Sequence, residues 1–596
     1  MKLFTITFVK EQLSIQIPEG TTLLDAQIQA GLLPDAPCGG RGTCGKCTVH
    51  ILSGQVTGRQ KACRVLIHSD MTVLTSASFR HHILAKGSSR EIPVSPMIRS
   101  LNVTVAKCPP GESTSDWERL KEGIRLVAPD ITEELSPNLS IAANLYECLK
   151  SNAYQVNVLL CGHELLSLRS ADADYYLAAF DIGTTTIVGY LLHGKTGEEL
   201  AVASLLNPQT QYGADVIMRS NYALEHGTGD LSASVRGALN QLLCKLCSEV
   251  HISPTAILQA ALVGNTCMHH LFLNISPGAL VHAPYNPTLS EALLINASDC
   301  DIHIHPEGRI LVLPVIAGFV GADTIGCLLA ADFDKREPIT LMIDIGTNGE
   351  LVIGNKDRMI TCSTAAGPAL EGAKITCGMR GAGGAVDHVY LNKNEILYTT
   401  IENKKPAGIC GSGLIDLTAL LLTAGIIDKS GRILSKEEVS TPAAQANAHR
   451  ITCIDNMPAF VLETAEKTQD QTPLYLTQKD IREIQLAKGA IATGIQLMCQ
   501  HLEITPDQIE EVLIAGAFGN YMSPESACAI GLIPSVLQER ITPIGNAAGE
   551  GAKIAVLNQQ EFERTKTLAR RIEFLELATD PAFQDCFVDN LEFPEQ

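Results

Sequence analysis

Four cysteines near the start of the chain have the spacing of a metal-cluster site. Cys38, Cys44, Cys47 and Cys63 follow the pattern C-x5-C-x2-C-x15-C. Three thiolates so close in sequence can surround one iron–sulfur cluster only if the backbone wraps it closely, and the glycines of this loop permit that approach. We therefore expect the four sulfurs to be the ligands of one cluster.

A structural zinc site is the alternative for the same cysteines, because four thiolates also suit tetrahedral Zn²⁺. Zinc ribbons usually present two C-x2-C knuckles, whereas this loop has one, embedded in glycine. The pattern is closer to that of plant-type [2Fe–2S] proteins, C-x4-C-x2-C…C, with one extra residue in the first gap. The other 15 cysteines show no comparable grouping, and no export signal precedes them. We expect reduced thiols and a single [2Fe–2S] cluster.

Two Asp-Ile-Gly-Thr loops have the residues of a phosphate-binding site. One begins at Asp181 after an apolar run, and the same layout returns at Asp344. In such a turn the glycine lets the backbone approach an anion, Thr hydroxyls donate to phosphate, and the Asp can hold Mg²⁺ directly or through water. The repeat indicates a duplicated domain with a cleft between its halves, and Asp181 and Asp344 are the expected catalytic pair. The ATP contacts predicted from these loops are Gly183, Thr184, Thr185, Thr186, Gly346, Thr347 and Asn348.

Further glycine-rich segments extend the predicted nucleotide site. Residues 408–414 and 513–520 each border an apolar stretch and open towards a helix, where bare backbone can pack on a nucleoside and a helix N-terminus can face phosphate. Residues 363–379 are expected to line the same cleft. The contacts predicted from these segments are Gly367, Pro368, Gly411, Ser412, Gly413, Gly516, Gly519 and Asn520.

Alternation and capping patterns predict the elements around these loops. Residues 3–9 and 13–18 alternate in polarity and predict a β-hairpin, followed by a helix that Thr22 can cap. The polar, proline-bearing stretch 86–99 predicts a flexible or extended linker. Residues 100–173 combine strand and helix patterns and predict a small α+β domain, which we expect to be a spacer.

The bulk composition excludes several classes of partner. The chain has 596 residues, too many for a single core, and its formal net charge of −20 argues against binding nucleic acid. The most apolar stretch, 310–320, is interrupted by Pro314 and Gly318 and is shorter than the roughly 20 residues needed to span a bilayer. We therefore expect a cytoplasmic protein with no membrane partner.

The charge is uneven along the chain. Residues 1–85 carry eight Lys or Arg against five Asp or Glu, a net of +3, which leaves −23 for the remainder. The basic residues on or beside the cysteine loop are Arg41, Lys46, Arg59, Lys61 and Arg64. We expect this basic rim to dock an acidic surface, either on a partner or on the chain's own body. A merely solvated loop is the alternative.

These motifs together resemble a known family. The phosphate loops and glycine segments are similar to those of the ATPases that share a fold with actin, hexokinase and the Hsp70 heat-shock proteins. Longer strings resemble one branch, the reductive activators of corrinoid proteins, over nearly the whole chain. These strings are NPQTQYGADVI (207–217), GNTCMHH (264–270), DIGTNGE (344–350), STAAGPALEGAKITCGMR (363–380), GICGSGLID (408–416), DIREIQLAKGAI (480–491) and AGAFGNY (515–521).

The resemblance implies a multidomain fold: an N-terminal β-grasp ferredoxin-like α+β domain, then an α/β actin-like ATPase body with duplicated halves. The expected divisions are a [2Fe–2S] domain at 1–85, a linker at 86–99, a small α+β domain at 100–173 and an ATPase domain at 174–596. The family also implies a homodimer through the ATPase body. Asn265 and Thr266, in one matching string, are expected to cap a helix or to approach the partner's cofactor.

The resemblance also implies a reaction. Such activators take one electron from a low-potential donor and, with Mg-ATP, reduce inactive cob(II)amide to cob(I)amide in a corrinoid methyl carrier. A plant-type cluster lies at about −400 mV. If the acceptor lies about 100 to 200 mV lower, the transfer is uphill by about 2 to 5 kcal/mol. Whether ATP hydrolysis drives this transfer or the release of the partner stays open.

The identity of the partner is narrowed by one comparison within the family. Activators of methylamine methyltransferases carry [4Fe–4S] clusters in a cysteine-rich C-terminal extension, and no such extension is visible here. The expected partner is therefore the corrinoid protein of an O-demethylase or of the acetyl-CoA pathway. Two other functions remain open: a small-molecule kinase with an accessory cluster, and an ATP-binding redox sensor.

Overall fold

The computed structural model describes residues 2–9, 13–30, 32, 40, 42, 47–75, 90–131, 135–137, 139–171, 173–346, 348–519 and 521–595. Several residues named above lie outside these ranges and stay predictions: Cys38, Arg41, Cys44, Lys46, Thr347 and Asn520. In the part of the chain that is described, no helix combines the length and hydrophobicity needed to cross a bilayer.

The N-terminal segment forms a five-stranded sheet with one helix. The strand order is β2-β1-β5-β3-β4, with β1 antiparallel to β2 and parallel to β5. Phe4, Ile6 and Phe8 point alternately into a buried core, as the period of a strand requires. Thr22 caps the helix by accepting a hydrogen bond from the Asp25 amide at 3.1 Å, so the predicted hairpin and capped helix are confirmed. The elements are β1 Leu3–Phe8, β2 Leu13–Pro18, α1 Leu23–Gln29, β3 Thr48–Ser53, β4 Gly58–Lys61 and β5 Met71–Leu74.

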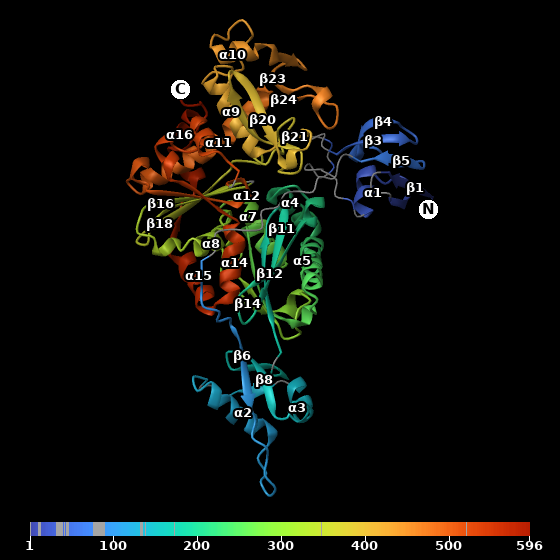
Figure 1. The fold of residues 1–596 in the computed structure, drawn as a ribbon, viewed down its shortest axis with the longest axis vertical. Coiled ribbons are helices and arrows are strands. Elements are labelled where there is room, and N and C mark those ends of the chain that lie inside the picture. The colour runs from blue at the N-terminus through green and yellow to red at the C-terminus, as the bar shows by residue number, and fades with distance from the viewer. Residues whose placement is uncertain are drawn as a thin grey trace.

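A second small sheet follows, with the order β6-β8-β9-β7. Ser115 begins its first helix in a reciprocal cap with Glu118, and Leu120 and Ile124 of that helix are buried against the sheet. The strand, helix and strand predicted in this region are confirmed. Figure 1 shows this sheet at one end of the molecule's long axis. The elements are β6 Ile98–Thr104, α2 Asp116–Val127, β7 Ser136–Pro137, α3 Leu139–Ser151, β8 Gln155–Cys161 and β9 Glu164–Ser170.

Two six-stranded sheets then repeat one topology. Their orders are β12-β11-β10-β13-β15-β14 and β26-β25-β16-β17-β18-β27. In each, an antiparallel meander of three strands is followed by a fourth strand that pairs in parallel with the first. A further strand, β15 in the first sheet and β26 in the second, pairs in parallel with that fourth strand. The repeat that the sequence predicts for two loops therefore extends over five strands.

The first of these sheets consists of β10 Tyr176–Ile182, β11 Thr186–His193, β12 Glu199–Leu206, β13 Ile257–Gly264, β14 Leu293–Asn296 and β15 Arg309–Val312. Its helices are α4 Val216–His226, α5 Gly229–Val250, α6 Thr266–Phe272, α7 Gly278–Val281 and α8 Ala322–Ala330. The second sheet consists of β16 Thr340–Ile345, β17 Gly349–Gly354, β18 Met359–Thr364, β25 Glu511–Ala515, β26 Ile541–Gly545 and β27 Ile572–Phe574. Its helices are α11 Gln478–His501, α12 Gly516–Gly519, α13 Pro524–Ala529, α14 Ala547–Leu557, α15 Gln559–Arg571 and α16 Phe583–Asp589.

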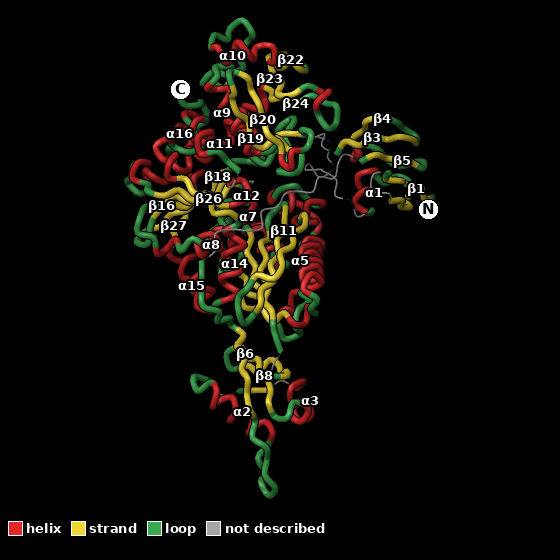
Figure 2. Tube along the Cα trace, in the orientation of Figure 1, coloured by secondary structure: helices red, strands yellow, loops and turns green. Residues whose placement is uncertain are grey.

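Helices α8 and α14 lie between the two sheets; α8 follows β15, and α14 follows β26 (Figure 2). Their backbones touch at two glycines. A Cβ on Gly551 would collide with the backbone of Gly326, and a Cβ on Gly326 would lie 2.8 Å from the Ala548 carbonyl oxygen. One apolar core spans this layer, with Tyr190 from the first sheet and Met342 from the second. The two halves are therefore joined through a close helix crossing.

A lobe of two three-stranded sheets covers the second half, with orders β20-β19-β21 and β22-β23-β24. Its elements are β19 Ala385–Asn392, β20 Glu395–Thr400, β21 Gly408–Ile409, α9 Gly411–Thr423, α10 Pro442–Asn447, β22 Ile451–Ile454, β23 Met457–Glu463 and β24 Leu474–Thr477. Figure 1 shows this lobe at the end of the long axis opposite the α2 and α3 sheet.

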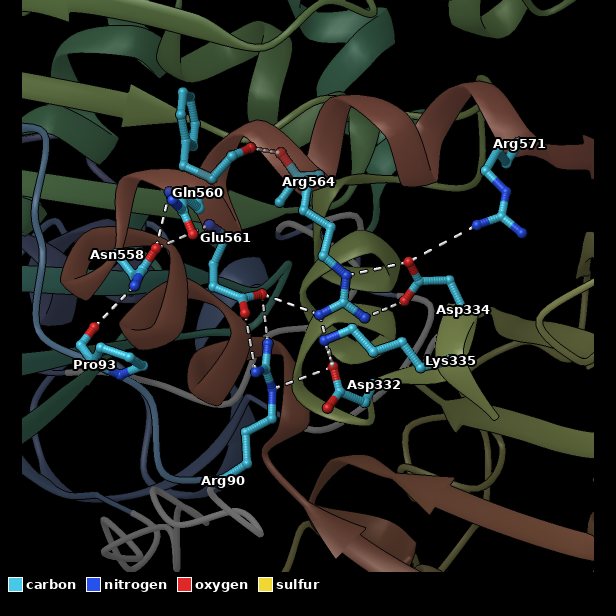
Figure 3. Close-up of polar contacts among 12 residues, drawn as sticks. Arg90, Pro93, Asp332, Asp334, Lys335, Asn558, Gln560, Glu561, Arg564 and Arg571 are labelled. Carbon is cyan, nitrogen blue, oxygen red and sulfur yellow. Dashed lines mark hydrogen bonds and ion pairs between the residues drawn. The ribbon is translucent and has the colours of Figure 1, made fainter. Parts of the chain in front are cut away.

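Residues 90–98, within the predicted linker, lie along the end of the helix crossing. Arg90 Nη1 donates to Glu561 Oε1 at 3.0 Å, and Arg90 Nε lies 3.5 Å from Asp332 Oδ1. Glu561 is on α15, directly after α14, and Asp332 follows α8 (Figure 3). Arg564 joins the same network through Asp332 at 2.6 Å. The described part of this stretch is extended, and it is fixed to both halves of the body.

Candidate functional site

A cavity of about 380 Å³ lies beyond the carboxyl ends of the central strands of both six-stranded sheets. Asp181 comes from β10, Asp344 from β16, and Gly516 follows β25. Ligands of open α/β sheets bind at this kind of edge. The predicted site residues that line the cavity are Asp181, Gly183, Thr184, Thr185, Thr186, Asp344, Gly346, Asn348, Gly411, Ser412 and Gly516.

The turn between β10 and β11 is held by hydrogen bonds on three sides. Gly183 N donates to Thr186 O at 2.9 Å, and a Cβ on Gly183 would lie 2.6 Å from that oxygen, so this position requires glycine. Asn207 Nδ2 donates to Gly183 O at 2.9 Å, and Asn265 Nδ2 donates to Thr184 Oγ1 at 2.8 Å. Asn265 also caps α6, as predicted. The turn is thus fixed with its Thr residues at the cavity.

Arg219 supports this turn from behind. The side chain is fully buried on α4 and donates to the carbonyl oxygens of Thr184 and Gly213, the latter at 2.9 Å. Its Nη1 also donates to Gln209 Oε1 at 3.3 Å, so the acceptors of its described hydrogen bonds are uncharged. Burial lowers the pKa of Arg219 to about 10, which leaves it protonated at neutral pH. A positive charge therefore lies directly behind the first turn.

The turn between β16 and β17 carries carboxylates instead. Asp344 is directly opposite Glu350 in the register of this hairpin. Gly346 N donates to Asn348 O at 2.9 Å and closes the turn. Gly516 approaches from the next strand with φ +83°, and a Cβ there would lie 2.9 Å from Asp344 Oδ1. A side chain at position 516 would therefore displace the Asp344 carboxylate.

Five carboxylic residues line the cavity, and four of them form a deep cluster: Asp181, Asp323, Asp344 and Glu350. They keep some contact with solvent through the cavity but lie deep in the protein. Burial, followed by repulsion within the cluster, raises the pKa of Asp181 and Asp323 to about 7 and that of Asp344 to about 6. The same causes raise the pKa of Glu350 well above its usual value. Carboxyl groups whose pKa is raised in this way are stabilised by a bound cation or by keeping a proton.

The carboxylates do not form a metal cage by themselves. Within the described ranges, no three His, Cys, Asp or Glu side chains are placed to hold one metal ion. Mg²⁺ usually keeps several waters and shares its remaining positions with one or two carboxylates and substrate phosphates. The donor set therefore fits a Mg²⁺ that arrives with a phosphate ligand.

Two of the four predicted cluster cysteines lie within the described ranges. Cys47 Sγ and Cys63 Sγ are 3.3 Å apart, and both residues are buried. A hydrogen bond of 2.9 Å from Ala62 N to Cys47 O holds the two segments together. The two sulfurs are close enough to ligate one iron–sulfur cluster, so the described residues fit that group.

Family models match the chain in four consecutive parts. A 2Fe-2S iron-sulfur cluster binding domain matches 7–71, the RACo linker region 87–174, the RACo middle region 176–336, and the C-terminal ASKHA domain of RACo 338–596. A corrinoid activation enzyme from Eubacterium limosum, RamQ, is 33% identical over 589 residues, which cover 97% of each chain. The chain belongs to this family of corrinoid activation enzymes.

Two further relatives of this activator also have names that refer to corrinoid proteins. The solved structure of a reductive activator for corrinoid,iron-sulfur protein is 31% identical, with a TM-score of 0.76 over 99% of this chain and 98% of that one. A [Co(II) methylated amine-specific corrinoid protein] reductase from Methanosarcina barkeri is 24% identical over 454 residues, 70% of this chain and 77% of the relative. The predicted family and the order of an iron–sulfur domain before an actin-like ATPase body are confirmed.

Four predicted nucleotide contacts of the activator lie away from the cavity lining. A Cβ on Gly413 would collide with the Val386 carbonyl oxygen, and one on Gly519 with the Ile514 side chain, so both glycines serve close packing. Gly367 and Pro368 begin a turn that carries Leu370 and Glu371 to the cavity. Thr347 and Asn520 lie outside the described residues.

Residues outside the predicted contacts also line the cavity, among them Asp323, Glu350, Arg380 and Asn546. The hairpin register offered a signal for Glu350, because it is opposite Asp344. Asp323 and Asn546 begin the crossing helices α8 and α14, and Asn546 caps α14 through a 3.0 Å bond from Gly549 N. No local sequence pattern predicts the position of Arg380, because its contact at the cavity is Thr185 of the opposite half.

Proposed function

We propose that this activator uses ATP to deliver one electron through a [2Fe–2S] cluster to a corrinoid protein, converting inactive cob(II)amide to cob(I)amide. The observation that most supports this is that the loops of both halves meet around one cavity of about 380 Å³, within the usual size for a small-molecule site. A nucleotide that contacts both halves would favour their closed arrangement. That differential binding is a source of free energy for an uphill electron transfer.

We assign different parts of the nucleotide to the two turns. Thr184, Thr185 and Thr186 face the phosphates, with the buried charge of Arg219 behind them. Asp181 and Asp344 would hold Mg²⁺ and would orient the attacking water. Gly411 and Ser412 at the start of α9, with Gly516 opposite, pack on the nucleoside; the Ser412 hydroxyl is already committed to Asp387 O at 2.8 Å.

The kinase alternative is disfavoured by a recess beside the cavity. This recess has a volume of about 10 Å³ and shares Val216, Asn265 and Asn348 with the cavity wall. It has room for about one water molecule and none for an organic phosphoryl acceptor. We therefore propose water as the phosphoryl acceptor and hydrolysis as the reaction.

The cluster and the partner complete the proposal. Cys38, Cys44, Cys47 and Cys63 hold the cluster, which supplies a single electron at low potential. The corrinoid protein belongs to an O-demethylase or to the acetyl-CoA pathway, and a low-potential donor outside this chain reloads the cluster. We also retain a homodimer, and the division of the chain at 1–85, 86–99, 100–173 and 174–596, as proposals.

An anaerobic absorbance assay tests this function. A corrinoid protein in the cob(II)amide state is mixed with reductant and the activator, with Mg-ATP or with no nucleotide. We expect cob(I)amide only with ATP, no cob(I)amide with Cys63→Ala, and normal reduction with Cys453→Ala, which alters an exposed thiol in the lobe. Reduction without ATP would contradict the proposed coupling. ATP binding without cobalt reduction for corrinoid proteins of both pathways would favour the redox sensor.

A further inference from the structure

Among the described residues that line the cavity, Arg380 is the one cation. The same lining contains five carboxylic residues: Asp181, Asp323, Asp344, Glu350 and Glu371. A nucleotide triphosphate adds further negative charge to such a space, and transferring phosphoryl groups are commonly stabilised by Arg, Lys or Mg²⁺. The position of Arg380 therefore matters for any phosphate bound here.

Arg380 reaches across the cavity from one half to the other. It belongs to the segment between β18 and β19 in the second half, yet its Nη2 donates to Thr185 Oγ1, in the first turn, at 3.3 Å. Its backbone is anchored close by, because Met379 N donates to Ile409 O at 2.9 Å and Gly378 bridges to Ile409. The guanidinium is thus presented to the phosphate turn by a backbone that the opposite half holds in place.

A second cation converges on the same turn. Arg219 donates to Thr184 O from behind, and the charge of Arg380 adds to burial in lowering the pKa of Arg219. Two arginines that approach adjacent residues of one turn repel each other, and their described hydrogen bonds end on uncharged groups. An anion between Thr185 and Arg380 would relieve this repulsion.

We propose that Arg380 contacts the γ-phosphate of ATP and stabilises the charge that develops on it during hydrolysis. The inference rests on the proposed ATPase function. Water attacks the γ-phosphorus, the bond from that phosphorus to the bridging oxygen breaks, ADP keeps the electron pair, and the proton lost by water goes to solvent. Since Arg380 and Thr185 belong to different halves, the contact exists only when the halves are closed, which makes hydrolysis a readout of closure.

The test compares Arg380→Gln with Lys374→Gln in the full chain. Lys374 lies on the same segment, is exposed, and pairs with Glu483 at 3.6 Å. Phosphate release is measured in single turnovers with excess protein, and binding of a non-hydrolysable ATP analogue is measured by calorimetry. Removal of a single charge-stabilising donor typically costs about 10²- to 10³-fold in kcat. We expect that loss for Arg380→Gln, with the affinity for the analogue changed by less than about tenfold, and no change for Lys374→Gln.

Chemical rescue separates catalysis from folding. Free guanidinium at low millimolar concentration should restore part of the turnover of Arg380→Gln and leave Lys374→Gln unaffected. If the wild-type chain hydrolyses ATP and Arg380→Gln has the same kcat, the inference about Arg380 is wrong while the proposed function stands. A wild-type chain that binds no nucleotide would overturn the proposed function itself. If Arg380→Gln lost turnover, analogue binding and a cooperative thermal unfolding transition all together, the role of Arg380 would be structural. That result would also reject the inference.

Discussion

The two hairpin turns of the activator have the same backbone plan and different chemistry. The β10–β11 turn has three Thr residues at the cavity and a buried arginine behind them. The β16–β17 turn has Asp344 opposite Glu350, and its own glycine neighbour, Gly516, makes room for the carboxylate. The two halves present equivalent edges, and we propose that the Thr-rich turn contacts the phosphates while Asp344 of the other edge acts with Asp181 on Mg²⁺ and water.

The largest effect should come from the carboxylate turn. Asp344→Asn keeps the shape but removes the charge that we propose to act on Mg²⁺ and water, so we expect kcat for ATP hydrolysis to fall by about 10²- to 10⁴-fold. Thr184→Val in the other turn removes a hydroxyl that accepts from Asn265 at 2.8 Å. Here we expect a change of about fivefold in ATP affinity, the size of one hydrogen bond, with kcat largely kept. Steady-state kinetics of both variants would separate the two roles, and equal losses of kcat would contradict the division.

The second-largest effect, on stability and ATP affinity, should come from Arg219, whose charge lies behind the β10–β11 turn. Arg219→Met leaves the carbonyl oxygens of Thr184 and Gly213 without donors, and we expect about 2 to 4 kcal/mol lower stability. ATP affinity should also fall, because the turn loses both its support and its positive charge. Arg236→Met is the matched control, since Arg236 donates to Phe272 O at 2.9 Å away from the cavity. Denaturant unfolding and calorimetry measure both quantities, and equal effects of the two variants would reject a special role for Arg219.

The joint between the halves gives a smaller, structural test. Gly551→Ala would place a Cβ against the Gly326 backbone at the α8–α14 crossing, and overpacking of this kind costs about 1 to 3 kcal/mol. Gly237→Ala, in open space on α5, is the control and should be neutral or slightly stabilising. Thermal unfolding measures both. If Gly551→Ala were as stable as the wild type, the halves would not be joined by backbone contact at this point.

The pH dependence of stability tests the carboxylate cluster without a substrate. In the folded chain Asp181 and Asp323 have pKa values of about 7, against 3.8 for an ordinary Asp. The folded state therefore binds protons that the unfolded state has released, and stability must fall as pH rises from about 4 to 7. We expect a loss of order 1 to 3 kcal/mol in the nucleotide-free protein. Mg-ADP should reduce this slope, and so should Asp323→Asn; a stability that rises over the same range would contradict the shifts.

Most of the predicted cluster and nucleotide-site residues come from short local motifs. Three of the four cysteines, and each of the two Asp-Ile-Gly-Thr loops, lie within about ten residues, so the sequence predicts them without knowledge of the fold. The sequence did not predict that Asp323 and Arg380 line the cavity. Asp323 reaches it through the helix crossing, and Arg380 reaches it because the two halves come together. The sequence also predicts nucleotide contacts at Gly413 and Gly519, where an added Cβ would meet the Val386 carbonyl oxygen and the Ile514 side chain. A glycine in sequence does not reveal which neighbour comes close.

A single-turnover measurement tests the coupling most directly. The cluster of the activator is reduced, excess reductant is removed, and the corrinoid protein in its cob(II)amide state is added before Mg-ATP. The account predicts no change until ATP arrives, then loss of one reduced cluster for each cob(I)amide formed, and neither event with Asp344→Asn. Transfer before ATP is added, or cob(I)amide formed while the cluster stays reduced, would contradict it.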